Sequence, residues 1–244
     1  MITVSIVSHG HGEMVSKIVE GLLDFSEVHQ VIVTLNVSEK LDFLDDKRLT
    51  IIQNSIPKGF GENHNFAFQQ CTSEFYCVLN PDISFIENPF PGLLEILLRP
   101  KVGLVAPLVC NLGGRVEDSA RYFPSPLSLA LRKFTQYKDS YVLQIGGDPL
   151  CVEWVAGMFM LFKSRVFREI QGFDEQYYLY VEDVDICTRV WNDHYKVVIN
   201  PSVTVIHDAR RASRINLRHM GWHISGLLKY FLKYFGSKPK IVKY

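Results

Sequence analysis

The sequence predicts an α/β fold in which helices flank a mostly parallel, doubly wound sheet. In the first half of the chain, apolar runs of strand length alternate with segments whose apolar residues recur at helical spacing. This alternation is typical of βαβ units, whose strands pair in parallel. Polar residues directly follow several of these runs, and such folds bind ligands at the carboxyl ends of their strands. With 244 residues, 47% of them apolar, we expect one main core.

The first half of the chain supplies the regular part of the pattern. A strand over residues 2–7 (ITVSIV) leads through the polar turn SHGHGE into a helix with apolar positions from Met14 to Leu23. Residues 28–35 and 49–53 are the next apolar strands. A glycine-containing loop, NSIPKGFGENHN, then precedes a helix that we expect to begin at Phe66.

The second half is less regular and predicts shorter elements. A strand over residues 75–79 ends at Asn80-Pro81-Asp82, where the proline forbids continuation as a central strand. Such tripeptides are also ordinary turns, so this motif alone does not establish a site. The other predicted strands cover residues 102–107, 152–162, 196–199 and 203–206, and the other predicted helices cover 163–170 and 184–191.

Cysteine usage and the N-terminal sequence narrow the class of protein. The five cysteines are an odd number without a CxxC pair, which favours neither a disulfide framework nor a zinc site. No basic region precedes the first apolar run, and no apolar run approaches the roughly 18 residues that cross a bilayer. We therefore expect a cytoplasmic protein without a standard export signal or a membrane span.

The formal net charge is zero, but the charges are unevenly distributed. Residues 209–244 hold nine of the 26 basic residues and no acid, a charge of +9, which leaves −9 on residues 1–208. From Leu217 onward, apolar residues recur at helical spacing, with Lys229 and Lys233 on the other side. We expect a domain over 1–208 and a basic amphipathic helix in 209–244 that packs on the domain or faces anionic lipid. Because the bases are interleaved with an apolar face, nucleic-acid binding is not expected.

Seven motifs follow one another along the chain: VSIVSHGH, GFGENHN, LNPD, SARYFPSP, VEWVAGMFML, GFDEQYYLYVEDVDICTRV and VIH. In this order they resemble the inverting GT-A glycosyltransferases of family 2, and especially the bacterial rhamnosyltransferases that use dTDP-L-rhamnose in O-antigen assembly. The resemblance extends from residue 2 to about residue 210. It implies a GT-A (Rossmann-like) fold and an enzyme that transfers a sugar from a nucleotide donor.

The resemblance assigns Asn80-Pro81-Asp82 to the metal site. Asp82 matches the DXD-type position and is the expected direct ligand of Mg²⁺ or Mn²⁺. Asn80 stands where the family has its first aspartate, and is expected to contact ribose, phosphate or metal-bound water. His207, after the last strand, matches a further metal ligand, although a histidine in such a place is more often structural. A divalent cation stabilises a diphosphate leaving group as its negative charge rises.

The acid-base chemistry is assigned by the same resemblance to Glu182 and Asp183, which match the ED motif of the family. Asp183 is expected to act as the base that takes the proton from the acceptor hydroxyl. Glu182 is expected to orient the acceptor. Acids at the start of a helix also favour the helix dipole by about 0.3–1 kcal/mol each, which is a sufficient explanation for Asp185.

Contacts with the nucleotide are implied at the ends of the first two strands and in the glycine-containing loop. Family members often have an aspartate at the end of the second strand, where this chain has Leu35, so the nucleobase stays open between thymine and uracil. Glycines allow the backbone to approach a phosphate, although a lone GxG is more often an ordinary loop. The expected donor-binding residues are Ser8, His9, Asn36, Gly59, Gly61, Asn65, Asn80 and Asp82.

Contacts with the acceptor are implied in two other segments. Trp154 and Gly157 lie in the motif that the family places beneath the donor sugar and the acceptor, although a tryptophan in an apolar strand is normally a core residue. Arg210 and Arg211 are expected to bind the diphosphate of the acceptor.

The resemblance thus implies transfer of L-rhamnose from dTDP-L-rhamnose to a polyprenyl-diphosphate-linked saccharide, by a metal-assisted inverting displacement. The enzyme would work on the cytoplasmic face of the inner membrane, attached through its basic amphipathic helix. Two alternatives stay open. One is the same mechanism with a UDP-hexose or UDP-N-acetylhexosamine donor, and the other is a catalytically silent module that binds a sugar nucleotide or a glycan.

Overall fold

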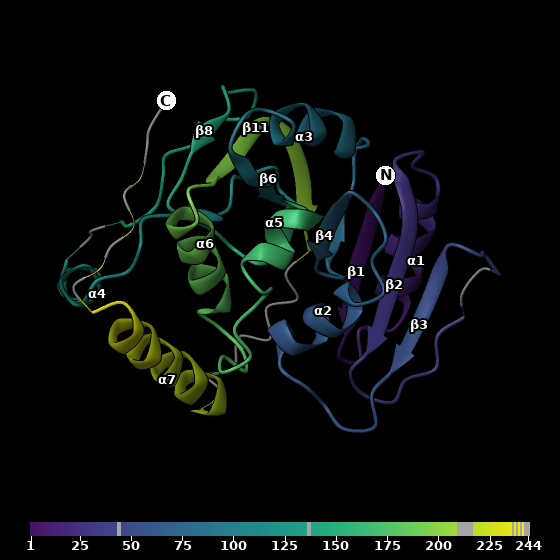
Figure 1. Cartoon of the computed structure of the whole chain (residues 1–244), viewed down its shortest axis with the longest axis horizontal. Helices are drawn as coiled ribbons and strands as arrows, with labels where there is room; N and C mark the ends of the chain where they lie inside the picture. Colours follow the sequence, from purple (N-terminus) through teal and green to yellow (C-terminus); the bar gives the residue numbers. More distant parts are fainter. Residues whose placement is uncertain are drawn as a thin grey trace.

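The computed structural model has a large central sheet with helices on both faces, as the sequence predicts (Figure 1). It describes residues 1–42, 45–135, 138–208 and 217–235, together with residues 237, 239 and 241. The strands of the sheet are β1 (Ile2–Ser8), β2 (Val28–Leu35), β3 (Leu49–Gln53), β4 (Phe75–Leu79), β5 (Ile83–Ser84), β6 (Val102–Asn111), β8 (Leu150–Cys151), β10 (Phe159–Lys163) and β11 (Lys196–His207).

Strand direction places the ends of five strands at one edge of the sheet. Within the described residues the order is β3-β2-β1-β4-β10-β6-β11-β5, with β8 also pairing with β11. β1 is parallel to β2 and β4, and β6 is parallel to β11. β10 lies antiparallel between β4 and β6, so β4 and β6 also run in the same direction. The carboxyl ends of β1, β2, β4, β6 and β11 therefore meet at the same edge.

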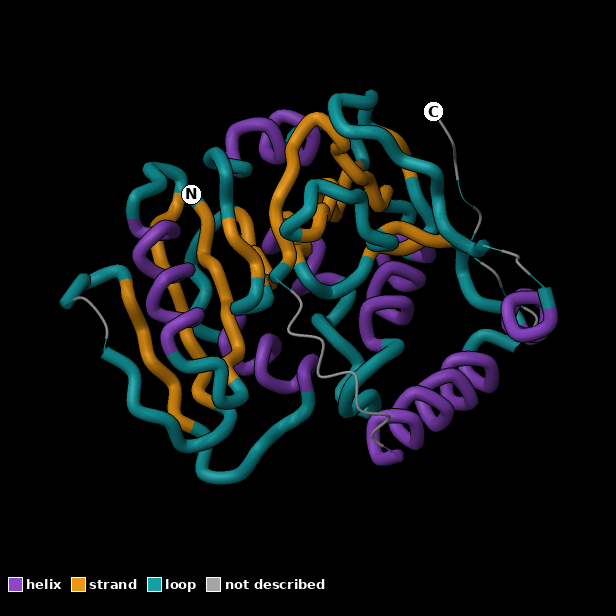
Figure 2. The backbone as a smooth tube through the Cα atoms, turned by 180° about the vertical axis from the view of Figure 1, so that it is seen from behind, coloured by secondary structure: helices purple, strands orange, loops and turns teal. Residues whose placement is uncertain are grey.

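The helices cover both faces of this sheet. α1 lies on one face, while α2 and α5 lie on the other, and α4, α6 and α7 gather on the side away from β3 (Figures 1 and 2). All five side chains of β4 are buried, as expected for a strand that is covered on both faces. The helices are α1 (Glu13–Leu23), α2 (Phe60–Phe68), α3 (Phe90–Leu97), α4 (Pro126–Phe134), α5 (Ser164–Glu169), α6 (Glu182–Asn192) and α7 (Leu217–Lys233).

Two predicted strand boundaries are wrong. The segment 152–162 is not one strand, because β9 (Trp154–Val155) pairs with β7 (Ala120–Arg121) in a separate two-stranded sheet and a turn precedes β10. Residues 196–199 and 203–206 are instead parts of the single strand β11, whose register with β6 shifts between Asn200 and Thr204. The shift absorbs the extra residues as a bulge, which periodicity does not reveal.

The expected start of the second helix at Phe66 is also wrong. α2 begins at Phe60, so the second half of the predicted glycine-containing loop is helical. A Cβ atom on Gly61 would lie 2.6 Å from Cβ of Phe173, and one on Gly59 would lie 2.9 Å from the carbonyl oxygen of Tyr178. These glycines allow α2 to pack closely on the chain around residues 173–178, which explains their presence without a loop.

The C-terminal helix α7 packs on the domain through its charged side. Nζ of Lys229 donates to the carbonyl of Gln176 at 2.6 Å, and Nζ of Lys233 lies 2.6 Å from Asp174. Of the two alternatives for this helix, the contacts of these two lysines agree with packing on the domain. The outward face is apolar, and its exposed residues are Leu217, Met220, Ile224, Leu228 and Leu232. In the part of the chain that the structure describes, no helix combines the length and the apolar character needed to span a bilayer.

Candidate active site

Four of the expected site residues lie at the shared edge of the sheet. Ser8 ends β1, Asn36 follows β2, Asn80 follows β4 and His207 ends β11. These strands are parallel to one another, so residues from four distant parts of the sequence converge there. The convergence that the sequence predicts is present.

Asp82 and His207 are in direct contact at this edge. Nε2 of His207 lies 3.1 Å from Oδ2 of Asp82, and Nδ1 of the same ring lies 2.7 Å from Oε2 of Glu117. The hydrogen bond with Asp82, and then that with Glu117, raises the pKa of His207 to about 9 against the opposing effect of burial. Sequence analysis did not single out Glu117, since it lies in an irregular segment and matches no motif.

The donor set around Asp82 fits a divalent cation that is held partly by its substrate. Oδ1 of Asp82 is buried and has no hydrogen-bond partner, which is costly for a carboxylate oxygen. Among the described residues, no group of three or more His, Cys, Asp or Glu side chains is arranged to hold a metal ion. Mg²⁺ sites commonly use one or two protein carboxylates, with substrate phosphates and water as the other ligands. Asp82 with His207 matches that type of site.

A short backbone link joins Asn80, beside Asp82, to Asp183. The amide of Asn80 donates to the carbonyl of Met158 at 2.9 Å, and the amide of the preceding Gly157 donates to Oδ2 of Asp183 at 3.3 Å. The side chain of Asn80 is half-buried and makes no hydrogen bond within the described residues. The side chain of Asn80 is therefore available to a ligand beside Asp82, and the backbone of Met158 and Gly157 links Asn80 to Asp183.

The acidic pair begins α6, and burial changes its protonation. Burial, followed by the charge of Asp183, raises the pKa of Glu182 well above its ordinary value. Burial also raises the pKa of Asp183, but the amides of Val184 and Gly157 oppose the shift by donating to its carboxylate. Asp183 thus ionises before Glu182. Two neighbouring acids with unequal pKa values are suited to different roles, the ionised one as base and the protonated one as hydrogen-bond donor.

The backbone just before this pair is strained. Tyr180 and Val181 have φ values of 71° and 73°, in the left-handed region that non-glycine residues rarely adopt. A β-branched residue such as Val181 is particularly disfavoured there. Each such residue costs about 1–3 kcal/mol, and residues of this kind cluster at active sites. This turn sets the direction in which the side chains of Glu182 and Asp183 point.

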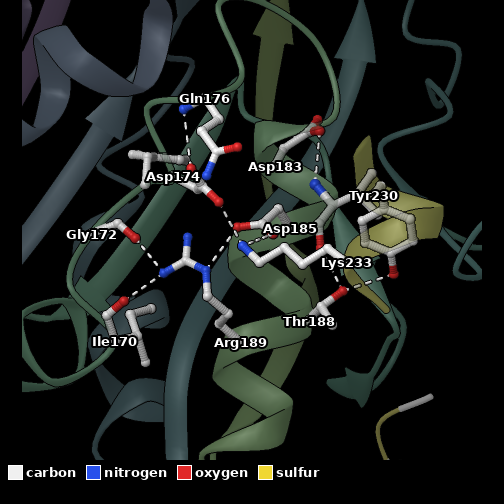
Figure 3. Close-up of polar contacts among 12 residues, drawn as sticks. Ile170, Gly172, Asp174, Gln176, Asp183, Asp185, Thr188, Arg189, Tyr230 and Lys233 are labelled. Carbon is white, nitrogen blue, oxygen red and sulfur yellow. Dashed lines mark hydrogen bonds and ion pairs between the residues drawn. The ribbon is translucent and has the colours of Figure 1, made fainter. Parts of the chain in front are cut away.

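Asp185 has a larger role than the helix-dipole explanation predicts. Its side chain is fully buried and lies 2.7 Å from both Nε of Arg189 and Nζ of Lys233 (Figure 3). The hydroxyl of Tyr234 donates to the same carboxylate at 2.9 Å. Arg189 in turn donates to the carbonyls of Ile170 and Gly172. Asp185 therefore links α6 to α7. The sequence signal for this role, an acid at the fourth position of α6, also fitted the helix-dipole explanation.

Asn36 lies where a nucleobase contact is expected, but its side-chain amide already makes hydrogen bonds within the protein. Its Oδ1 accepts from the amides of Lys58 and Asn54 at 2.8 and 2.9 Å. Its Nδ2 donates to the carbonyl of Lys58 and lies 3.2 Å from Nδ1 of His9. Asn36 thus fixes the loop before α2, and His9 is the exposed member of this group.

The turn after β1 is held by an acid that sequence analysis did not single out. The amides of Gly10 and Gly12 donate to the two carboxylate oxygens of Glu39 at 3.2 and 3.1 Å. Ser8 is buried, and its hydroxyl accepts from the amide of His11 at 3.3 Å. These hydrogen bonds fix the turn that holds Ser8 and His9 at the carboxyl end of β1.

The remaining expected donor contacts are structural in this arrangement. Oδ1 of Asn65 accepts from the amide of Phe173 at 2.8 Å, while its Nδ2 donates to the carbonyl of Phe173 and to Glu175. With Gly59 and Gly61 packed on residues 173–178, this face of α2 holds the chain that leads to the acidic pair. The expected approach of a phosphate to these glycines stays a prediction beside this structural role.

Of the expected acceptor residues, Trp154 and Gly157 lie in β9 and in the turn that follows it. Trp154 is half-buried in β9, its indole nitrogen donates to the carbonyl of Tyr122 at 2.9 Å, and Arg121 lies over its ring. Gly157 contacts Asp183 as described above. Arg210 and Arg211 lie outside the described residues.

Comparison with known proteins gives two relatives that are both named as rhamnosyltransferases. The sequence matches no protein-family model. It is 25% identical over 256 residues to rhamnosyltransferase WbbL of Escherichia coli strain K12, covering 96% of this chain and 93% of that protein. It is 30% identical over 176 residues to the N-acetylglucosaminyl-diphospho-decaprenol L-rhamnosyltransferase of Mycobacterium tuberculosis strain H37Rv, covering 67% of this chain and 56% of that protein.

Solved structures agree on the fold. The structure of GalNAc-T7 with UDP, GalNAc and Mn²⁺ superposes with a TM-score of 0.71 and 13% identity, covering 97% of this chain and 48% of that chain. The mannosyltransferase PcManGT of Pyrobaculum calidifontis, with GDP-Man and Mn²⁺, gives a TM-score of 0.62 and 15% identity, covering 95% and 63%. This chain is a family 2-like GT-A glycosyltransferase. The glycosyltransferase is related to bacterial rhamnosyltransferases, as its motif order predicts.

Proposed function

We propose that this glycosyltransferase transfers L-rhamnose from dTDP-L-rhamnose to a polyprenyl-diphosphate-linked saccharide by a metal-assisted displacement that inverts the anomeric centre. The backbone link between two carboxylates carries this proposal. Asn80, beside Asp82, bonds to Met158, and the adjacent Gly157 bonds to Asp183. One carboxylate has an unpartnered oxygen that suits a cation, and the other has a raised pKa that suits a base.

The donor would bind at the shared strand edge. Asp82 and His207 would hold Mg²⁺ or Mn²⁺ together with phosphate oxygens of the donor, and Asn80, Ser8 and His9 would contact the nucleotide. When bound, the cation stabilises the negative charge of the departing diphosphate. Two proteins of the same fold are described as complexes, one with UDP and Mn²⁺ and the other with GDP-Man and Mn²⁺. This supports a nucleotide-sugar donor and a divalent cation for the present enzyme.

The transfer itself needs one base. The carboxylate of Asp183 takes the proton of an acceptor hydroxyl while that oxygen forms a bond to the anomeric carbon. The bond from the anomeric carbon to the diphosphate oxygen breaks on the opposite face, and the diphosphate leaves with the electron pair. Attack opposite the leaving group inverts the configuration. Protonated Glu182 donates a hydrogen bond that orients the acceptor, and Trp154 and Gly157 line its path.

The sugar and the acceptor are proposed from the relatives. Both are rhamnosyltransferases by name, and the mycobacterial one acts on a decaprenol-linked sugar diphosphate. One observation favours a second donor class, a UDP-sugar. Leu35 is buried at the position where an acid would bind the nucleobase. The side-chain amide of Asn36 is hydrogen-bonded to the backbone of Lys58. No side chain at that position selects thymine over uracil.

Because the proposed acceptor is lipid-linked, the enzyme is proposed to work at the cytoplasmic face of the inner membrane. The outward face of α7 exposes a row of large apolar side chains, with Leu228 59% and Leu232 79% exposed. Such a face suits the boundary between headgroups and acyl chains. The basic excess of residues 209–244 suits anionic lipid.

Nucleotide release tests the function directly. The purified protein is incubated with dTDP-L-rhamnose, UDP-glucose or UDP-N-acetylglucosamine, with a short lipid-linked GlcNAc diphosphate acceptor, Mg²⁺ or Mn²⁺, and then EDTA. Acceptor-dependent dTDP release that EDTA abolishes is expected, and Asp82→Asn should remove it. Release from a UDP-sugar would replace the donor and keep the mechanism. Nucleotide binding without release from any donor would favour the silent binding module.

A further inference from the structure

Helix α7 contacts the segment that leads into the acidic pair along its whole length. The hydroxyl of Tyr180 lies 2.8 Å from Nδ1 of His219, in the first turn of the helix. Further contacts follow at successive turns toward the end of α7. They join Gly226 to Val181, Lys229 to Gln176, Tyr230 to Thr188, and Lys233 to Asp174 and Asp185.

One of these contacts is made by the backbone of a glycine. A Cβ atom on Gly226 would lie 3.0 Å from Cγ2 of Val181 and 3.1 Å from the carbonyl oxygen of Tyr180. The backbone of α7 therefore rests directly on the two residues with left-handed backbone. Gly226 is buried, whereas Gly221 of the same helix is exposed and would have no atom within 4 Å of an added Cβ.

The position of α7 along this contact is fixed by its last turn. Lys233 follows Gly226 by seven residues, which is two helical turns, so both lie on the same face. Nζ of Lys233 lies 2.7 Å from Oδ1 of Asp185, whose side chain is fully buried (Figure 3). A buried carboxylate depends strongly on its partners. Any slide of α7 would therefore separate this pair and move Gly226 off Val181.

We propose that α7 is a brace that holds the strained Tyr180–Val181 turn and thereby positions the carboxylate of Asp183 for proton removal. Gly226 and Lys233 are its positioning residues. The C-terminal helix thus belongs to the catalytic machinery, in addition to its outward apolar face. This inference rests on the proposed role of Asp183 as base.

A pair of glycine substitutions on the same helix tests the brace. Gly226→Ala and Gly221→Ala gain the same helix propensity, but only the first presses on the turn. We expect Gly226→Ala to lower kcat at least tenfold with donor KM within about twofold of wild type, because a small displacement of a base is enough for such a loss. Gly221→Ala should retain wild-type values. Lys233→Met should lower kcat in the same way, and Lys233→Arg should restore most of it. Lys47→Met, at an exposed lysine, should have no effect.

Hydrogen exchange supplies a readout that needs no substrate. The amide of Asp185 donates to the carbonyl of Val181, and the amide of Phe60 donates to the carbonyl of Tyr178, both at 2.9 Å. Both amides should exchange faster in Gly226→Ala and not in Gly221→Ala, while the strands of the sheet stay protected. A folded Gly226→Ala variant with wild-type kcat and wild-type exchange at these amides would overturn the brace. If wild type transfers no sugar from any donor, the proposed function fails and the exchange result alone decides the brace.

Discussion

Nε2 of His207 lies 3.1 Å from Oδ2 of Asp82, although the two residues are 125 positions apart in the chain. The ring is held in this orientation from its other side, because Nδ1 lies 2.7 Å from Glu117. Carboxylates that hold the second nitrogen of a ligating histidine commonly tune metal affinity. Glu117 thus becomes a testable part of the proposed cation site.

Glu117→Gln should weaken cation binding while sparing the chemistry. We expect the Mn²⁺ concentration for half-maximal activity to rise about 10–100-fold, since loss of such a partner costs that much in affinity. The rate at saturating Mn²⁺ should change little. Titration of transferase activity with Mn²⁺ measures both values. Glu95→Gln, at an exposed ion pair with Arg99, serves as the control, and an equal shift in both variants would contradict the assignment.

The pH dependence of transfer should reveal Asp183 as the base. Burial raises its pKa to about 6, so below that pH the carboxyl holds a proton and cannot accept another. We expect kcat/KM to fall about tenfold for each pH unit below about 6. The charge of Arg121 acts in the opposite direction and lowers this pKa. Arg121→Gln should therefore move the acid limb of the pH profile upward, and a limb that stays in place would contradict the role of this charge.

Replacement of the base should lower activity and raise stability at neutral pH. Asp183→Asn should reduce kcat about 10²–10⁴-fold with nucleotide binding retained. A carboxyl with a raised native pKa stabilises the fold only while protonated, and that contribution is lost as pH rises through about 6. The variant should therefore unfold at a higher temperature than wild type at about pH 8, with the difference gone at about pH 4. Thermal unfolding at both pH values measures this, with exposed Asp45→Asn as the control.

Charge on the outward face of α7 should release the protein from lipid. Ile224→Glu and Leu228→Glu place carboxylates among exposed apolar side chains, at positions that are themselves more than half exposed. We expect sedimentation with anionic vesicles to fall severalfold, because apolar insertion and attraction to anionic lipid both weaken. Activity on a water-soluble acceptor should be unchanged. Ile86→Glu, at a more exposed apolar residue outside α7, should still sediment.

The alternating pattern predicted the sheet and the edge of the site because both depend on buried apolar runs. β1, β2 and β4 were located within a residue or two, and their polar ends converge. The bulge in β11 and the early start of α2 were missed, since neither follows from periodicity. The glycines at 59 and 61 indicated a loop, whereas their small size serves close packing on residues 173–178.

The contacts that hold the site were the least predictable part. Glu117 and Lys233 act on residues 90 and 48 positions away, and no local pattern links such partners. The helix dipole offered a simple explanation for Asp185 from sequence. That explanation suits an exposed acid at the start of a helix, whereas the side chain of Asp185 is fully buried. Long-range pairing of charged groups depends on the assembled fold.

The reversed direction of β10 also bears on how such enzymes diversify. An antiparallel strand brings its amino end to the edge where the parallel strands bring their carboxyl ends, so Gly157 and Met158 arrive beside Asn80. The segment between β6 and β10, which carries α4 and Trp154, thus leaves the sheet and returns to it next to the reacting groups. Exchange of the part of that segment between β7 and β8 would replace one wall of the proposed acceptor path, and it would leave intact Glu117 and the strands that present Asp82 and His207. Acceptor preference can in this way evolve as a separate module.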